Sequence, residues 1–174
     1  MPTIITHPAV ALLKTWFPRV PRRAVWLGAV ATVLPDADVV AFALGIPYEH
    51  LFGHRGITHS IAFAFAVALL GTFLVDRRRA TFTFLFLCAL SHPVLDAFTN
   101  GGLGVAFFAP FSNERYFFTW TPIDVSPIGI DFFSAWGMRV LASELVWVWL
   151  PVGALALIGR YVARRLARGH HSNF

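Results

Sequence analysis

The sequence is poor in cysteine and in charged residues. Cys88 is the single cysteine among 174 residues, which excludes an intramolecular disulfide and a metal cluster held by several thiolates. Only 13% of the residues are charged, whereas soluble domains carry about a quarter. Together with 57% hydrophobic residues and a mean hydropathy of +0.65, this scarcity indicates an integral membrane protein rather than a very apolar soluble one.

Acidic residues are fewer than basic residues, and the formal net charge is +5. The basic side chains do not form the groove-like pattern of a nucleic-acid-binding protein, so we expect no direct contact with nucleic acid. They fall into three packets beside apolar stretches, namely Lys14–Arg23, Arg77–Arg79 and Arg160–Arg168. Such packets follow the positive-inside rule. We therefore predict that all three lie on the cytoplasmic side, with residues 160–174 as a basic cytoplasmic tail.

Apolar segments separated by turn residues fill most of the chain. They are Ile4–Phe17, Ala24–Ile46, Ile61–Val75, Thr81–Leu90 continuing to Phe98, and Val140–Gly159. We expect an all-α integral membrane bundle with about four or five membrane segments, some of them broken at polar motifs. The bundle forms one domain over residues 1–174 and crosses the inner, cytoplasmic membrane several times, with its C-terminus in the cytoplasm.

Short polar clusters interrupt these apolar segments. They are His7, Pro35–Asp38, His54–Ser60, Ser91–Asp96 and Glu144. Ionisable side chains are costly inside a membrane and therefore indicate function, and His with Asp favours a metal site over a buried ion pair. At about 1.5 Å per helical residue, the clusters lie about 16–27 Å from the nearest basic packet, measured along the helix away from the cytoplasmic side. We predict that they form one site in the outer half of the bilayer.

Two of the clusters have spacings that bear on metal binding. His92 and Asp96 lie one helical turn apart and could share a metal ion, or they could simply hydrogen-bond to each other. Asp36 and Asp38 are two residues apart, so both can face one site only where the helix unwinds after Pro35. The alternative for this pair is that it caps the start of a second helix.

The cluster that begins at His54 predicts a turn followed by a helix, which Thr58 or Ser60 could cap. A helix N-terminus favours an anion, and the neighbouring Arg55 is a bidentate donor suited to phosphate. The alternative is that His54 and His59 are solvated loop residues.

Two further features leave alternatives open. Glu144 could be an additional metal ligand, an orienting residue or a partner of Arg139. The aromatic stretch Phe107–Ile130 could fold over the site as a lid, with Arg115 contacting a substrate anion, or it could be a purely structural loop.

In this order, the motifs resemble the bacterial family of membrane-bound, metal-dependent hydrolases described as LexA-binding and inner-membrane-associated. The resemblance covers roughly the first two-thirds of the chain and continues through Thr99, Gly102 and Pro110. More distantly, the chain is similar to the zinc-dependent phospholipase C superfamily, which consists of all-helical phosphoesterases. The second resemblance implies that His7, Asp36 or Asp38, His54 or His59, His92 and Asp96 bind the metal. The candidate metal ligands are therefore His7, Asp36, Asp38, His54, His59, His92 and Asp96.

These residues and resemblances together predict a membrane-bound, metal-dependent hydrolase of the phosphoesterase type. We expect it to hold one or two divalent ions, with Zn²⁺ preferred, and to act on a phosphoester of a lipid or lipid-linked substrate. The expected general base is Asp38 or Asp36, with His54 as the next candidate, and Arg55 is expected to contact the phosphate. The alternatives are a metal-ion transporter and a non-catalytic membrane regulatory protein.

Overall fold

The protein is a bundle of helices, and its computed structural model describes residues 1–75, 78–127 and 129–171. Asp76 and Arg77, as well as the last three residues of the basic tail, lie outside the described residues. Within the described residues all regular elements are helices, as predicted for an all-α protein. In chain order they are η1 (His7–Trp16), α1 (Arg22–Val33), η2 (Leu34–Val39), α2 (Val40–Ala43), η3 (Ile57–His59), α3 (Ile61–Thr72), α4 (Arg78–Ala97), η4 (Gly129–Phe132), α5 (Ala135–Glu144), η5 (Leu145–Trp149) and α6 (Leu150–His171).

Three continuous helical stretches are long and apolar enough to cross a membrane. They are Arg22–Ala43 with 22 residues, Arg78–Ala97 with 20 and Ala135–Arg168 with 34. A helix of 20 residues is about 30 Å long, which matches the hydrocarbon core of a bilayer. The helices η1 and α3 contain 10 and 12 residues. The predicted segments thus consist of three helices of spanning length and two shorter ones that pack among them.

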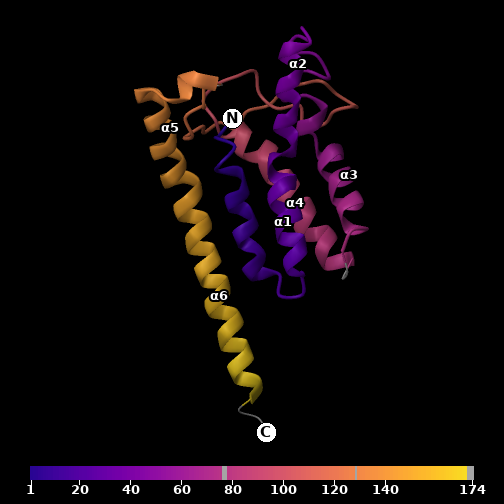
Figure 1. The fold of residues 1–174 in the computed structure, drawn as a ribbon, viewed down its shortest axis with the longest axis vertical. Coiled ribbons are helices and arrows are strands. Elements are labelled where there is room, and N and C mark those ends of the chain that lie inside the picture. The colour runs from indigo at the N-terminus through magenta and orange to yellow at the C-terminus, as the bar shows by residue number, and fades with distance from the viewer. Residues whose placement is uncertain (76–77, 128, 172–174) are drawn as a thin grey trace.

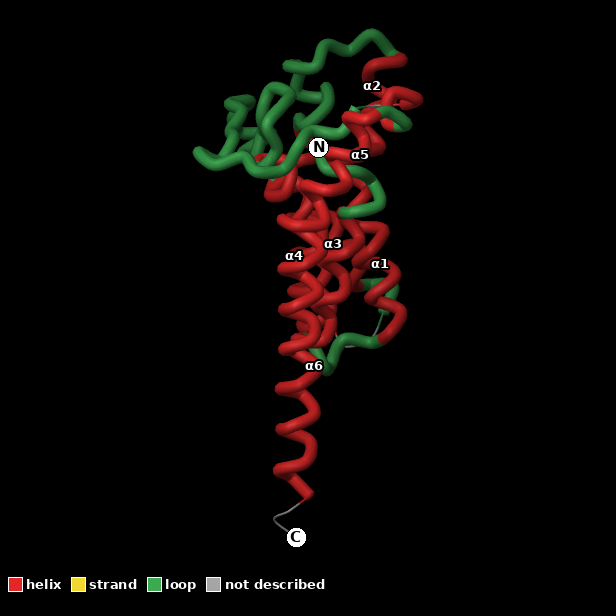
Figure 2. Tube along the Cα trace, turned by 90° about the vertical axis from the view of Figure 1, so that its left-hand side faces the viewer, coloured by secondary structure: helices red, strands yellow, loops and turns green. Residues whose placement is uncertain are grey.

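The helices lie side by side, and their loops gather at one end of the bundle (Figures 1 and 2). Helix α4 contacts α1 and α3, while η1 contacts α1 and α6. The connection from η1 to α1, the start of α4 and the C-terminal part of α6 lie at the opposite end (Figure 1). The described residues of the three basic packets therefore lie at the same end of the molecule. We call this the basic end.

Two of the spanning helices change their geometry at polar motifs, as predicted. Helix α1 ends at Val33 and continues as the 3₁₀ helix η2, which contains Pro35. In the C-terminal span, the π-helical turn η5 begins immediately after Glu144. Helix α3 begins where predicted, because the Ser60 hydroxyl accepts a hydrogen bond of 3.0 Å from the Phe63 backbone N–H. The helix breaks thus bring the polar motifs to the loop end.

Small residues allow the helices to approach closely in the middle of the bundle. Ala31, Ala64 and Ala89 form a buried contact between α1, α3 and α4. At the crossing of α1 and α4, a Cβ on Gly28 would lie 2.7 Å from the Phe84 ring. Membrane helices associate through such tight packing, because lipid supplies no hydrophobic driving force between them.

We expect Gly28→Leu to destabilise the bundle by about 1–3 kcal/mol, because the new side chain overpacks the α1–α4 crossing. The matched control is Gly153→Leu in α6, where an added Cβ meets nothing within 4 Å. Both changes replace a glycine inside a helix by leucine, so the difference between their free energies of unfolding reports the overpacking at the α1–α4 crossing. Unfolding in mixed micelles, followed by circular dichroism during titration with SDS, measures it. Equal stability of the two variants would contradict the packing described for α1 and α4.

Candidate functional site

Five ionisable side chains from four helical elements meet at the loop end of the bundle. We call them the His/Asp cluster, and they are His7 from η1, Asp36 from η2, His59 from η3, and His92 and Asp96 from α4. Each is at most 5% exposed. The prediction that these segments contribute to a single site agrees with this arrangement.

Four atoms of the cluster lie close to one another in the five pairs that follow, as expected of ligands around one ion. His92 Nε2 lies 3.0 Å from His59 Nε2, 3.3 Å from Asp36 Oδ1 and 4.0 Å from Asp96 Oδ2. His59 Nε2 lies 3.4 Å from Asp96 Oδ2 and 3.9 Å from Asp36 Oδ1. Tetrahedral zinc ligands at about 2.0–2.2 Å from the ion are about 3.3–3.6 Å apart. The donor set therefore fits one divalent ion.

Hydrogen bonds at Nδ1, the ring nitrogen that points away from the cluster, orient the imidazoles of His59 and His92. His92 Nδ1 lies 2.6 Å from the Thr32 carbonyl oxygen, and His59 Nδ1 lies 3.1 Å from Asp38 Oδ2. A carbonyl and a carboxylate can only accept, so each Nδ1 donates and each Nε2 faces the cluster. Metal-binding histidines are oriented in this way by outer partners.

The carbonyl of Thr32 is available to His92 because of the neighbouring proline. In a 3₁₀ helix a carbonyl accepts from the N–H three residues later. Three residues after Thr32 stands Pro35, which has no N–H. The proline that interrupts the spanning helix therefore also leaves an acceptor for the His92 ring.

Several buried atoms of the cluster have no hydrogen-bond partner in the described structure. They are both ring nitrogens of His7 and both carboxylate oxygens of Asp36, whereas Asp96 Oδ2 forms an ion pair with Arg55 Nε at 2.9 Å. The His7 ring stacks on His92 with 3.8 Å between centroids, and its Nε2 lies 3.8 Å from Asp96 Oδ1. Burying ionised oxygens without partners is costly. The cluster therefore has an excess of acceptors that a cation would satisfy.

A proton competes with a cation at the centre of the cluster. Burial lowers the pKa of His59, but hydrogen bonds and charge from Asp38 and Asp96 outweigh this effect and raise the pKa to about 9. These contacts therefore favour the protonated form of His59 where no metal ion is bound. A metal ion that binds His59 must displace this proton.

Asp38 lies beside the cluster, and both its oxygens are engaged by neighbouring donors. His54 Nδ1 lies 2.6 Å from Asp38 Oδ1. The Thr58 hydroxyl at 2.6 Å and the Arg55 backbone N–H at 3.2 Å both donate to Oδ2, which also contacts His59. These contacts favour Asp38 as the residue that orients two histidines, whereas Asp36 has the free oxygens. The sequence includes both aspartates among the candidate ligands and predicts that one binds the metal, without distinguishing them.

His54 stands between Asp38 and the cluster. One of its ring nitrogens lies within 4.8 Å of ligand atoms of Asp36 and His59. Because Nδ1 is engaged by Asp38, the remaining nitrogen, Nε2, is available to accept a proton or to bind an ion. Both of the roles predicted for His54, base and ligand, are compatible with this position.

Arg55 is only 1% exposed, and its guanidinium group contacts protein groups on several sides. Its Nε lies 2.9 Å from Asp96 Oδ2, and its terminal nitrogens donate to the Gly101 carbonyl at 2.9 Å and to the Thr99 hydroxyl at 3.0 Å. Its backbone has φ +60°, which is uncommon for a residue other than glycine. These contacts favour a positioning role over the predicted contact with a substrate phosphate.

We expect Arg55→Met to destabilise the protein by about 3–5 kcal/mol, because it leaves the Asp96 charge buried without a partner. Adding Asp96→Asn should recover part of the loss, since the double variant contains neither charge. Unfolding in SDS of the two single variants and the double variant gives the coupling free energy between Arg55 and Asp96. Arg139→Met is the control, because Arg139 is exposed and contacts the Trp136 ring face. Additive effects of the two single changes would show that the pair is not coupled.

Glu144 belongs to a neighbouring hydrogen-bond network rather than to the cluster. Its carboxylate accepts hydrogen bonds from the Thr3 backbone N–H and from the hydroxyls of Thr3 and Thr6, both at 2.7 Å. The three alternatives for Glu144 thus resolve in favour of an orienting residue. It ties the N-terminal segment to the end of α5, which positions His7 one residue after Thr6.

The aromatic stretch 107–130 covers the loop end, and its contacts favour the structural alternative. Arg115 donates to the carbonyl oxygens of His54 and Tyr48 at 3.0 and 2.9 Å. Just before this stretch, the Ala106 N–H donates to the Arg55 carbonyl at 3.0 Å. The loop therefore braces the turn that contains His54 and Arg55, and Arg115 is occupied by backbone acceptors.

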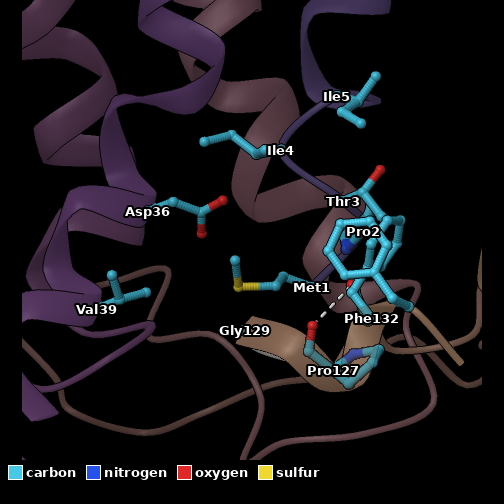
Figure 3. Close-up of a pocket in the computed structure, with 12 residues that line it drawn as sticks. Met1, Pro2, Thr3, Ile4, Ile5, Asp36, Val39, Pro127, Gly129 and Phe132 are labelled. Atoms are coloured by element: carbon cyan, nitrogen blue, oxygen red, sulfur yellow. Dashed lines mark hydrogen bonds between the residues drawn. The ribbon is translucent and has the colours of Figure 1, made fainter. Parts of the chain in front are cut away.

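Sequence reasoning missed Thr32 and the cavity beside the cluster, and it named Thr99 only as part of the family resemblance. Thr32 acts through its backbone carbonyl and Thr99 through its hydroxyl, and no spacing pattern marks either of them as a site residue. The cavity has a volume of about 400 Å³, and Asp36 forms part of its wall. Figure 3 shows the Asp36 side chain pointing toward Met1 and Ile4 of the N-terminal segment. Apolar residues occur throughout the chain, so its composition could not identify this lining.

The spanning helices and the buried cluster define the molecule as a helical membrane protein with a candidate metal-binding site. Residues 1–168 match the family described as YdjM inner membrane protein, and the chain therefore belongs to that family. It is 43% identical over 174 residues to the inner membrane protein YbcI of Escherichia coli (strain K12), an alignment that covers 95% of this chain and 99% of the relative. No solved structure matches the chain.

The family assignment and the apolar helices show that this is an inner-membrane protein, as predicted. The names of the family and of the relative refer to location alone. They do not mention a hydrolase, zinc or the phospholipase C superfamily, so those parts of the resemblance stay predictions.

Proposed function

We propose that the protein is a metal-dependent hydrolase whose centre is the His/Asp cluster. The observation that carries the proposal is the spacing of His59 Nε2, His92 Nε2, Asp36 Oδ1 and Asp96 Oδ2, between 3.0 and 4.0 Å in the pairs given above. The burial of these side chains and the unpaired carboxylate oxygens of Asp36 support it, because a cation would satisfy these acceptors.

Imidazole and carboxylate ligands suit zinc among the common divalent ions. Asp36, His59, His92 and Asp96 would hold the first ion, with His7 next to them, and His54 could take part in a second site with Asp36 and His59. A bound Zn²⁺ would lower the pKa of water toward 7 and polarise the scissile group.

The side chains around the cluster supply orientation and proton transfer. Hydrolysis of a phosphoester forms a bond from the water oxygen to phosphorus and breaks the bond from phosphorus to the alcohol oxygen. One proton leaves the water, and one reaches the departing alcohol. His54 suits this proton transfer, since Asp38 fixes its Nδ1 and leaves Nε2 free. The structure thus favours His54 over Asp38 as the base.

The membrane setting favours a lipid or lipid-linked substrate. If the basic end faces the cytoplasm, as the positive-inside rule predicts, the cluster lies in the outer half of the bilayer. The core between the cluster and the basic end contains apolar side chains, among them Ala68, Phe84 and Leu85. This filling disfavours a metal-ion path through the molecule, and so it favours a hydrolase over a transporter.

Elemental analysis of protein purified under mild conditions should find about one divalent ion per chain. His92→Ala and Asp36→Asn should each lower the content at least tenfold, because each removes a ligand. The matched controls are His50→Ala and Asp131→Asn, which alter exposed residues of the same types and should keep the wild-type content. Circular dichroism verifies that each variant is folded. Metal-free wild type, or equal loss in the controls, would refute the metal centre.

Protein in lipid nanodiscs should hydrolyse a phosphoester substrate, tested with a chromogenic phosphodiester and with phosphatidylglycerol. A chelator should abolish the rate and added Zn²⁺ should restore it. His54→Ala should lower the rate about 10²–10⁴-fold, which is the usual contribution of a general base, and His50→Ala should not change it. Bound metal without hydrolysis would contradict the enzyme, and zinc flux into proteoliposomes would then identify a transporter.

A further inference from the structure

The cavity beside Asp36 connects the cluster to the outside of the bundle. Its volume is about 400 Å³, and its walls come from the N-terminal segment, from η2 and from η4 with the residues around it. The Ser126 N–H donates to the Met1 carbonyl at 2.9 Å and joins two of these walls. Figure 3 shows the Asp36 carboxylate turned into this space, with Val39 below it and Phe132 on the far side.

Asp36 distinguishes this cavity from an ordinary apolar depression. The side chain is 5% exposed, and neither carboxylate oxygen has a hydrogen-bond partner. Its Oδ1 lies 3.3 Å from His92 Nε2, so the inner end of the cavity is the cluster itself. The other side chains in the wall are mainly apolar, among them Ile4, Val39 and Phe132. An occupant therefore needs an apolar body and one polar group placed at Asp36.

The outer rim of the cavity consists of large apolar side chains that the bundle leaves uncovered. Ile5 is 62% exposed and Phe133 is 85% exposed. In an inner-membrane protein, exposed apolar side chains at a spanning bundle are suited to contact with lipid. The cavity therefore opens toward the acyl region rather than toward a polar vestibule.

The volume of the cavity limits the part of an occupant that can lie inside it. A water-sized group occupies about 30 Å³ of liquid, so about 400 Å³ holds on the order of a dozen such groups. This is enough to hold one hydrocarbon chain of moderate length inside the cavity.

We propose that this cavity binds a single hydrocarbon chain of an amphiphilic phosphoester, which enters from the lipid and places its phosphoester at the metal ion that Asp36 would help to hold. The assignment rests on the proposed function and specifies its substrate class. The walls bind the chain, whereas the cluster acts on the phosphoester at the inner end.

A second cavity, of about 530 Å³, lies on the other side of η2 and includes Leu44, Phe52 and Phe63 in its wall. It reaches Asp38 rather than Asp36. Both oxygens of Asp38 are engaged by His54, Thr58 and their neighbours, so this cavity presents no unpaired group to a substrate. The cavity at Asp36 is therefore the one suited to a scissile group.

Photo-crosslinking with a non-hydrolysable probe tests the assignment. Wild-type protein in nanodiscs is irradiated with dodecylphosphonate that carries a diazirine on its chain, and labelled peptides are mapped by mass spectrometry. Labels should concentrate on the peptides that contain Ile4, Val39 and Phe132. An excess of unlabelled dodecylphosphonate should remove them, whereas methylphosphonate, which lacks the chain, should not.

Val39→Trp should fill the cavity and lower the competed labelling at least tenfold while the metal content stays at the wild-type value. The matched control is Val30→Trp in the same spanning helix, where the side chain is 58% exposed, and it should label like wild type. If Val39→Trp fails to fold, the competition pattern of the wild type decides. Labels at Leu44, Phe52 or Phe63, or labels that dodecylphosphonate does not compete, would overturn the assignment.

The two proposals fail in different ways. Specific labelling of a protein that hydrolyses no phosphoester would refute the proposed function and leave a chain-binding cavity. An active, metal-containing enzyme without specific labelling would refute the cavity assignment alone.

Discussion

Asp96 carries its charge in the interior of a membrane bundle, where an unpaired carboxylate would be too costly to keep ionised. Arg55 Nε, 2.9 Å away, supplies the opposite charge. This pair constrains the loop end of the molecule. The guanidinium also donates to Thr99 and Gly101, so the chain after α4 is tied to the turn that precedes η3. Because η3 contains His59, the same interaction sets the distance between the histidines of two helices.

A second layer of neutral and charged acceptors completes the site. Thr32 and Asp38 hold the far nitrogens of His92 and His59, and both acceptors belong to the segment that contains Asp36. The end of α1 and the 3₁₀ helix η2 that follows it thus contribute a ligand candidate and two orienting groups within a few residues. Hydrogen bonds of this kind fix the orientation of the histidine rings, as outer partners do for metal-binding histidines. The cavity at Asp36 then provides access without breaking any of these hydrogen bonds.

Much of the fold and of the candidate site could be predicted from local patterns, and the failures have a common cause. His7, His59, His92 and Asp96 stand out because each interrupts an apolar segment, and helical rise places them in one layer. Asp36 and Asp38 have the same chemistry and the same local context, so spacing could not tell which of them has free oxygens. The sequence predicted that the Arg55 guanidinium is free to contact a phosphate, and it left the role of Glu144 open. Both roles are set by partners more than 40 residues away in the chain, which local patterns do not identify.

The sequence by itself determined that the chain is a helical membrane protein, and it predicted most of the ionisable residues that the structure brings together. Both follow from a local property, the cost of placing a polar group in an apolar segment. The tertiary structure decided which carboxylates are satisfied and which face the cluster, because their donors come from other helices and loops. It also decided that a cavity leads to Asp36, since that space exists only where the N-terminal segment, η2 and the residues before α5 come together.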